Sequence, residues 1–119
     1  RAKTQVIILS DTFTQFAQPL MAKLGYPTLF CNELLVAQDG SISGYSLRQN
    51  DGKRKAVKAL KSINAKIFAA GDSFNDLGMI EEADTGMLFK APDSIKKAHT
   101  KIASCEEYDE LLSAIESFL

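Results

Sequence analysis

Four polar residues, widely spaced along the chain, are of the types that together bind a phosphate group and a divalent metal ion. They are Ser10, Lys53, Asp72 and Asp76. A serine hydroxyl beside backbone N–H groups at the start of a helix favours a phosphate, and a lysine adds a compact positive charge. Aspartate oxygens are hard ligands of the kind that Mg²⁺ takes, with the phosphate supplying another oxygen. These residue types therefore predict a site for phosphate and Mg²⁺.

The predicted phosphate and metal residues follow predicted strands. Residues 6–9 form a continuous apolar run, typical of a strand buried in a parallel sheet, and the polar turn Ser10-Asp11-Thr12 comes next. A second buried strand is predicted over residues 66–70, and the turn Gly71-Asp72-Ser73 follows it. Because ligand groups of a doubly wound sheet lie at the carboxyl ends of its strands, we expect both turns at one edge of the sheet.

The first polar turn leads into a predicted amphipathic helix over residues 13–24. Pro19 is expected to kink this helix or to restart it. Its apolar stripe, which includes Phe13, Phe16 and Leu20, is expected to belong to the core rather than to a ligand site.

The rest of the chain alternates between predicted strands and helices. Helices are expected over residues 51–63, 77–83, 92–99 and 108–119, and short strands over residues 86–89 and 101–103. Asp39-Gly40 tolerates the positive φ angles of a two-residue turn and predicts a β-hairpin between residues 34–38 and 41–47. The pattern indicates one α/β domain over residues 1–119, with a doubly wound, mainly parallel sheet and an inserted β-hairpin.

Charge and cysteine usage narrow the classes of partner. The net charge of -1 and the absence of long runs of like charge argue against a nucleic-acid or membrane surface. No apolar stretch is long enough to span a bilayer. Cys31 and Cys105 have no metal-ligand spacing, so we expect two free thiols and a cytoplasmic protein.

Three segments in this order resemble motifs two, three and four of the haloacid dehalogenase-like phosphatases. They are Ile8 to Thr12, Lys53 at the start of a helix, and Ala70 to Asp76. The GDSxND form of the last segment, together with residues 18–21 and 44–49, is most similar to the phosphoserine phosphatase branch and its phosphoserine/homoserine phosphotransferase members. The resemblance covers essentially all 119 residues.

The resemblance implies a Rossmann-like core with Mg²⁺ as cofactor and a role for each matched residue. Lys53 is implied as the catalytic residue that stabilises charge. The implied phosphate-binding residues are Ser10, Asp11, Thr12 and Lys53, the metal ligands are Asp72 and Asp76, and the supporting residues are Gly71, Ser73 and Asn75.

Simpler interpretations compete with these roles. Asp72 or Asp76 could cap the helix that follows, and Asp11 and Thr12 could cap the helix after them. Arg54 and Lys55 compete with Lys53 for the role of the positive charge, and Ser10 alone is compatible with an ordinary turn.

The family's first motif, an Asp-x-Asp whose first aspartate takes the phosphoryl group, does not occur in the 119 residues, and neither does the helical cap. The chain therefore resembles the C-terminal portion of such an enzyme, and its start at Arg1 leads us to expect an upstream segment. The missing strand would leave two unpaired strand edges, so we expect pairing with an N-terminal segment, homo-oligomer formation or closing up of the sheet.

The expected function is Mg²⁺-dependent hydrolysis or transfer of the phosphoryl group of a small phosphorylated metabolite, once the nucleophile segment is joined. The alternative from the residues is a non-catalytic α/β module that forms a homo-oligomer or binds a partner. A receiver-like phosphoacceptor domain is weaker because no acidic cluster occurs at the expected position.

Overall fold

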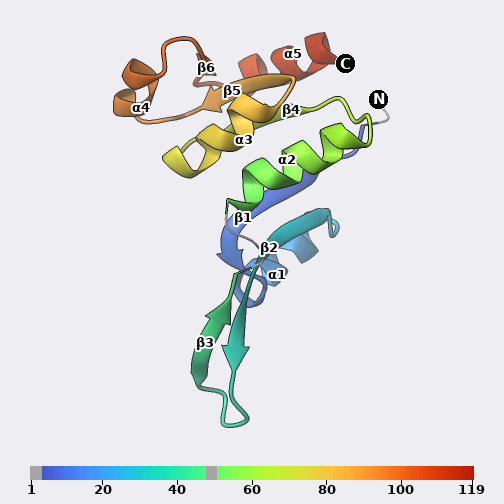
Figure 1. Ribbon diagram of the computed structural model, residues 1–119, viewed down its shortest axis with the longest axis vertical. Coiled ribbons are helices and arrows are strands. Elements are labelled where there is room, and N and C mark those ends of the chain that lie inside the picture. Colours follow the sequence, from blue (N-terminus) through green and yellow to red (C-terminus); the bar gives the residue numbers. More distant parts are fainter. Residues whose placement is uncertain (1–3, 48–50) are drawn as a thin grey trace. The chain divides into compact units, whose positions relative to one another are not determined.

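The computed structural model describes residues 4–47 and 51–119 of the chain. The chain divides into two compact units, Arg1–Asn50 and Asp51–Leu119. Figure 1 shows the strands and helices of each unit, coloured along the sequence.

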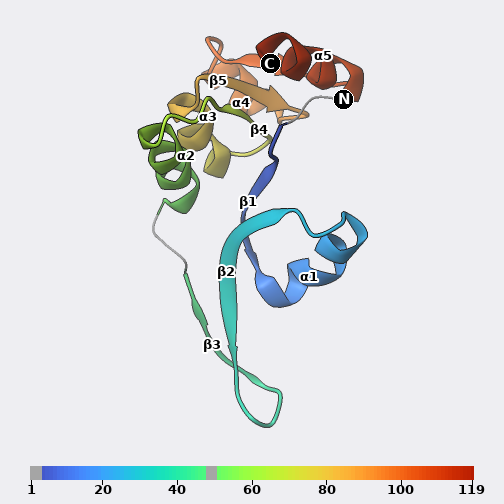
Figure 2. The ribbon, with the colours of Figure 1, turned by 90° about the vertical axis from the view of Figure 1, so that its right-hand side faces the viewer.

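The first unit is built on three strands and one helix. Its elements are β1 (Ile7–Phe13), α1 (Thr14–Lys23), β2 (Thr28–Val36) and β3 (Ile42–Ser46). The first half of β2 pairs parallel with β1, and its second half pairs antiparallel with β3, so the strand order is β1-β2-β3 (Figure 2). The predicted β-hairpin is confirmed, and its first strand, β2, also belongs to the parallel pair with β1.

The hairpin turn is longer than expected. The loop spans residues 37–41, with the N–H of Ala37 bonded to the carbonyl of Ser41 at 2.8 Å and Gly40 at a φ of +87°. The carboxylate of Asp39 accepts hydrogen bonds from the backbone N–H and the hydroxyl of Ser41. The two-residue turn was therefore wrong, because this side chain stabilises a wider loop.

Helix α1 is continuous through Pro19, which neither ends nor restarts it. Only Ala17 and Met21 of this helix are buried, whereas Phe16 and Leu20 are 64% and 56% exposed. The prediction that Phe16 and Leu20 belong to the core was therefore wrong. The buried positions lie four residues apart on a narrow face, and Phe16 instead contacts the ring edge of Phe13 at 6.1 Å between centroids.

The second unit is a three-stranded parallel sheet with helices. Its elements are α2 (Gly52–Ser62), β4 (Phe68–Gly71), the 3₁₀ turn η1 (Phe74–Asp76), α3 (Leu77–Glu82), β5 (Thr85–Phe89), α4 (Asp93–Ala98), β6 (Ala103–Cys105) and α5 (Tyr108–Phe118). The strand order is β4-β5-β6, and both pairs are parallel. The predicted helices of this half are confirmed, while the last strand lies two residues later than expected.

The core of the second unit lies where α2 and α3 pack together and α3 packs on the sheet. Val57, Ile80 and Leu88, which lie on α2, α3 and β5, are almost fully buried, and so is Ile95 of α4. Gly86 of β5 has no room for a side chain, because a Cβ atom would overlap the backbone of Ile80 in α3. The α/β class with parallel strand pairing is thus confirmed, and the described strands form two sheets of three.

The structure also bears on the cysteines, on possible membrane spans and on the strand edges. Cys31 and Cys105 are both free, as predicted. Among the described residues, no helix is both long and apolar enough to cross a membrane. Within the described strands, β1 and β4 each lie at one end of their own sheet, as expected if each has an unpaired edge. Pairing of these edges with an N-terminal segment or with a second copy of the chain stays a prediction.

Candidate functional site

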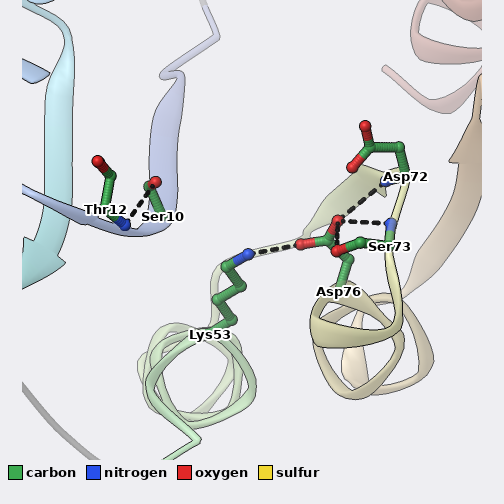
Figure 3. Close-up of polar contacts among 6 residues, drawn as sticks. All are labelled: Ser10, Thr12, Lys53, Asp72, Ser73 and Asp76. Atoms are coloured by element: carbon green, nitrogen blue, oxygen red, sulfur yellow. Dashed lines mark hydrogen bonds and ion pairs between the residues drawn. The ribbon is translucent and has the colours of Figure 1, made fainter.

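The loop after β4 is organised around a buried carboxylate. Asp76 is only 6% exposed, and its Oδ2 atom accepts hydrogen bonds from the backbone N–H groups of Asp72 and Ser73 at 2.9 and 3.1 Å. The hydroxyl of Ser73 donates a third bond to the same oxygen at 3.2 Å (Figure 3). Ser73 is the N-cap of η1, so the interpretation of Asp72 as the cap of this turn was wrong.

Gly71, at the end of β4, makes this loop possible. A Cβ atom at this position would lie 2.5 Å from the Cβ, Cγ and Oδ2 atoms of Asp76. Real Cβ atoms do not approach other atoms so closely, and the Asp76 side chain is already held by several hydrogen bonds. Glycine at this position therefore allows the buried carboxylate to fold back under the strand end.

Lys53 reaches the same carboxylate from the first turn of α2. Its Nζ atom lies 2.7 Å from Oδ1 of Asp76, and the two side chains are 13% and 9% exposed. The competing cations lie elsewhere, since Arg54 is half exposed and pairs with Glu82 at 3.5 Å, and Lys55 is exposed. Within the second unit, Lys53 is thus the lysine that enters the Asp76 network.

The pKa of Asp76 lies below its ordinary value although the group is buried. Burial alone raises the pKa of a carboxyl group. Here the hydrogen bond and charge of Lys53, with the N–H groups of Asp72 and Ser73, stabilise the carboxylate more than burial destabilises it. Asp76 is therefore an ionised group whose two oxygens are both engaged.

Asp72 differs from Asp76 in its exposure and in the hydrogen bonding of its carboxylate. It is exposed at the carboxyl end of β4, and its side chain points away from Asp76 (Figure 3). Among residues 4–47 and 51–119, no hydrogen bond or ion pair of its carboxylate occurs, and no group of three or more acidic, histidine or cysteine side chains is placed to hold a metal ion. Asn75 is also exposed, on η1.

The predicted phosphate residues of the first unit lie inside β1, not in a turn after it. Leu9 pairs with Phe30 and Phe13 pairs with Asn32, so β1 advances by four residues while β2 advances by two. The segment Ser10-Asp11-Thr12 is therefore a bulge in the strand. The helix that follows has Phe13 at its N-cap, so the alternative of Asp11 or Thr12 as caps was wrong.

Ser10 is held within this bulge by its neighbour. Its Oγ atom accepts a hydrogen bond from the backbone N–H of Thr12 at 3.1 Å (Figure 3). Because a hydroxyl can accept and donate at once, Ser10 keeps its own proton for an acceptor such as a phosphate oxygen. Ser10, Asp11 and Thr12 belong to the first unit and the Asp76 network belongs to the second, and each group is described within its own unit.

Asn32 of β2 was not among the predicted residues. Its side-chain amide donates a hydrogen bond at 3.1 Å to the backbone carbonyl of Asp11, which belongs to the bulge. The sequence signal for it is faint, a polar residue in a mostly apolar strand.

Comparison with known proteins places the predicted site residues in a known protein family. A model of the haloacid dehalogenase-like hydrolases matches residues 1–81, a span that contains every predicted site residue. The chain belongs to this family. The α/β fold with parallel strands is therefore the haloacid dehalogenase-like fold, as the resemblance of the motifs implied.

Two curated relatives within the family are named as phosphoserine phosphatases. A phosphoserine phosphatase of Pseudomonas syringae pv. tomato is 48% identical over 93% of this chain and 47% of its own length. The phosphoserine phosphatase ThrH of Pseudomonas aeruginosa is 45% identical over 93% of this chain and 54% of its own length. The chain thus spans about half the length of these relatives.

A solved structure supports the fold. A substrate-bound phosphoserine phosphatase complex superposes with a TM-score of 0.74 at 24% identity, over 92% of this chain and 55% of the other. At this identity the likeness concerns the arrangement of strands and helices.

Proposed function

We propose that this chain carries phosphate- and metal-binding residues of a phosphoserine phosphatase-like enzyme, which hydrolyses or transfers the phosphoryl group of a small phosphorylated metabolite. The observation that supports this most is the contrast between two neighbouring carboxylates. Asp76 is buried and saturated with donors, whereas Asp72 is exposed at the strand end, with no hydrogen bond or ion pair of its side chain within the described residues. One carboxylate holds the loop while the other is available to a ligand.

The chemistry of this loop fits Mg²⁺. Mg²⁺ is commonly bound by one or two carboxylates together with waters and a substrate phosphate. Asp72 would hold the ion, and Asp76 would support it by fixing the backbone of Asp72 and Ser73. When bound, Mg²⁺ would neutralise negative charge on the phosphate. Because both oxygens of Asp76 already accept hydrogen bonds, we assign it this supporting role in preference to direct ligation.

The remaining residues act on the phosphate group. Ser10 would donate a hydrogen bond to a phosphate oxygen while its own oxygen still accepts the hydrogen bond from the N–H of Thr12. Lys53, held by Asp76, provides a fixed positive charge, and such preorganised charge stabilises the negative charge that accumulates during phosphoryl transfer. The chain has no Asp-x-Asp segment, so we propose that the nucleophile comes from a segment outside these 119 residues.

The test is catalysis by the whole gene product that carries this sequence. We expect Mg²⁺-dependent release of phosphate from phosphoserine or p-nitrophenyl phosphate, and a fall in kcat/KM on the order of a hundredfold or more in Asp72→Asn, because the variant loses a charged metal ligand. Asp109→Asn removes an exposed carboxylate from the first turn of α5 and is the matched control, expected to keep the wild-type rate. Full activity of Asp72→Asn, or no hydrolysis by the wild type, would overturn the proposal.

A further inference from the structure

The bulge in β1 interrupts the hydrogen-bond ladder where the predicted phosphate residues lie. The pairing of β1 with β2 stops at Leu9 and resumes at Phe13, so the peptide groups of the bulge leave the regular ladder. Backbone groups that leave the ladder need other hydrogen-bond partners, from side chains or from water. The partners found here come from two side chains, Ser10 and Asn32.

A single peptide group is held at both ends. The carbonyl of Asp11 accepts a hydrogen bond from the Nδ2 atom of Asn32 at 3.1 Å. The N–H of Thr12, which belongs to the same planar peptide group, donates to Oγ of Ser10 at 3.1 Å. Because the C=O and N–H of a trans peptide point in opposite directions, Asn32 on one side determines where the N–H points on the other.

Asn32 is itself fixed by its neighbours. Its residue pairs with Phe13, at the position where the ladder resumes, and the hydroxyl of Thr14 donates to its backbone carbonyl at 3.2 Å. The backbone that carries the amide is therefore tied to both β1 and α1. Because its backbone is fixed, the Asn32 amide is suited to orient the Asp11–Thr12 peptide rather than to bind a ligand reversibly.

We infer that Asn32 is a positioning residue for phosphate binding, acting through the Asp11–Thr12 peptide on the hydroxyl of Ser10. The inference rests on the proposed function of Ser10. Without the Asn32 amide, the carbonyl of Asp11 loses this hydrogen bond and the orientation of the peptide is less well fixed. The Thr12 N–H then bonds Oγ of Ser10 less often, and the hydroxyl samples other rotamers. Binding of phosphate must then also order this hydroxyl, which weakens the affinity for phosphate.

Gln15 offers a matched comparison in the same unit. Its side-chain amide bonds the backbone N–H and carbonyl of Leu34 at 3.0 and 3.2 Å, so it also ties α1 to β2 through side chain-to-backbone bonds. Both of these bonds join Gln15 to Leu34, and neither reaches the bulge. If Asn32 only stabilised the fold, substitutions of Asn32 and of Gln15 would have similar effects on phosphate affinity.

The test uses the whole gene product with Asn32→Leu and Gln15→Met, which keep the approximate side-chain size and remain neutral. We expect the Kd of inorganic phosphate, measured by titration, to rise about fivefold in Asn32→Leu and to change by less than about twofold in Gln15→Met. Amide exchange of Thr12 should accelerate in the first variant alone. An equal effect of both variants on phosphate affinity, or none in Asn32→Leu, would overturn the inference.

Two further outcomes keep the test decisive. If the wild type binds no phosphate, the proposed function fails, and Thr12 amide exchange still decides the role of Asn32: acceleration in Asn32→Leu supports it and no change refutes it. If Asn32→Leu does not fold, Thr14→Val removes the hydroxyl that donates to the Asn32 carbonyl and also lies 3.4 Å from Sγ of Cys31. It should shift both readouts in the same direction by a smaller amount, and unchanged readouts would contradict the inference.

Discussion

Asp76 is the residue on which the loop after β4 depends. It brings together a lysine from α2, two backbone N–H groups and a serine hydroxyl, and it is the one buried charged side chain among the described residues. A buried charge is tolerated in a protein when its partners satisfy it. The residue that the motif suggested as a metal ligand therefore has a structural function that the motif alone does not reveal.

Removing the charge of Asp76 should destabilise the protein strongly. Asp76→Asn removes the ion pair with Lys53, whose two side chains are 13% and 9% exposed, and we expect a loss of about 3 kcal/mol in the free energy of unfolding. Urea unfolding measures it. Arg54→Met, which breaks a half-exposed pair with Glu82, is the control and should cost much less. Equal losses in the two variants would contradict the account.

The same comparison has a defined pH dependence. The pKa of Asp76 is lowered from 3.8 in the folded state, so the stabilisation is fully present above the unfolded value and is lost as pH falls through the lower, folded value. The difference in stability between wild type and Asp76→Asn should therefore be constant near neutral pH and shrink below about pH 4. A difference that grew as the pH fell would have the wrong sign.

At the scale of elements, two glycines test how closely the strand ends are packed. Gly71→Ala places a Cβ atom 2.5 Å from Asp76, and we expect a loss of about 2 kcal/mol together with displacement of the Asp76 carboxylate. Gly44→Ala in β3 meets only the Cδ1 atom of Leu35, at 3.6 Å, and should have little effect. Thermal unfolding of both variants measures the contrast. A Gly71→Ala protein as stable as Gly44→Ala would contradict the described loop.

Strands and helices were predictable where one local pattern decides them. The apolar run after residue 66 and the periodic run from residue 51 correspond to β4 and α2. The bulge in β1 was not predictable, because strand register depends on pairing with β2 and on the Asn32 amide, which lies 21 residues from Asp11 in sequence. The buried face of α1 was mispredicted for a similar reason, since several apolar faces compete and packing selects one.

At the scale of the whole molecule, the order of three motifs was enough to predict the family and the α/β fold. Those motifs identify Ser10, Lys53 and Asp72 by type and spacing, but they do not distinguish a metal-binding carboxylate from one that holds the loop. What the structure adds is that Asp72 is exposed, whereas Asp76 is buried and hydrogen-bonded; the metal-binding role of Asp72 is our proposal. The chain matches about half the length of each curated relative, so the residues proposed here account for part of the proposed reaction.

The most direct test of the central claim is the coupling between Mg²⁺ and phosphate binding. In the whole gene product, the Kd of inorganic phosphate should fall by at least about tenfold when Mg²⁺ is added, because we propose that ion and anion bind to one site. Asp72→Asn should abolish this coupling, while Asp109→Asn should retain it. Phosphate affinity that does not respond to Mg²⁺ in the wild type, or a response that persists in Asp72→Asn, would contradict the account.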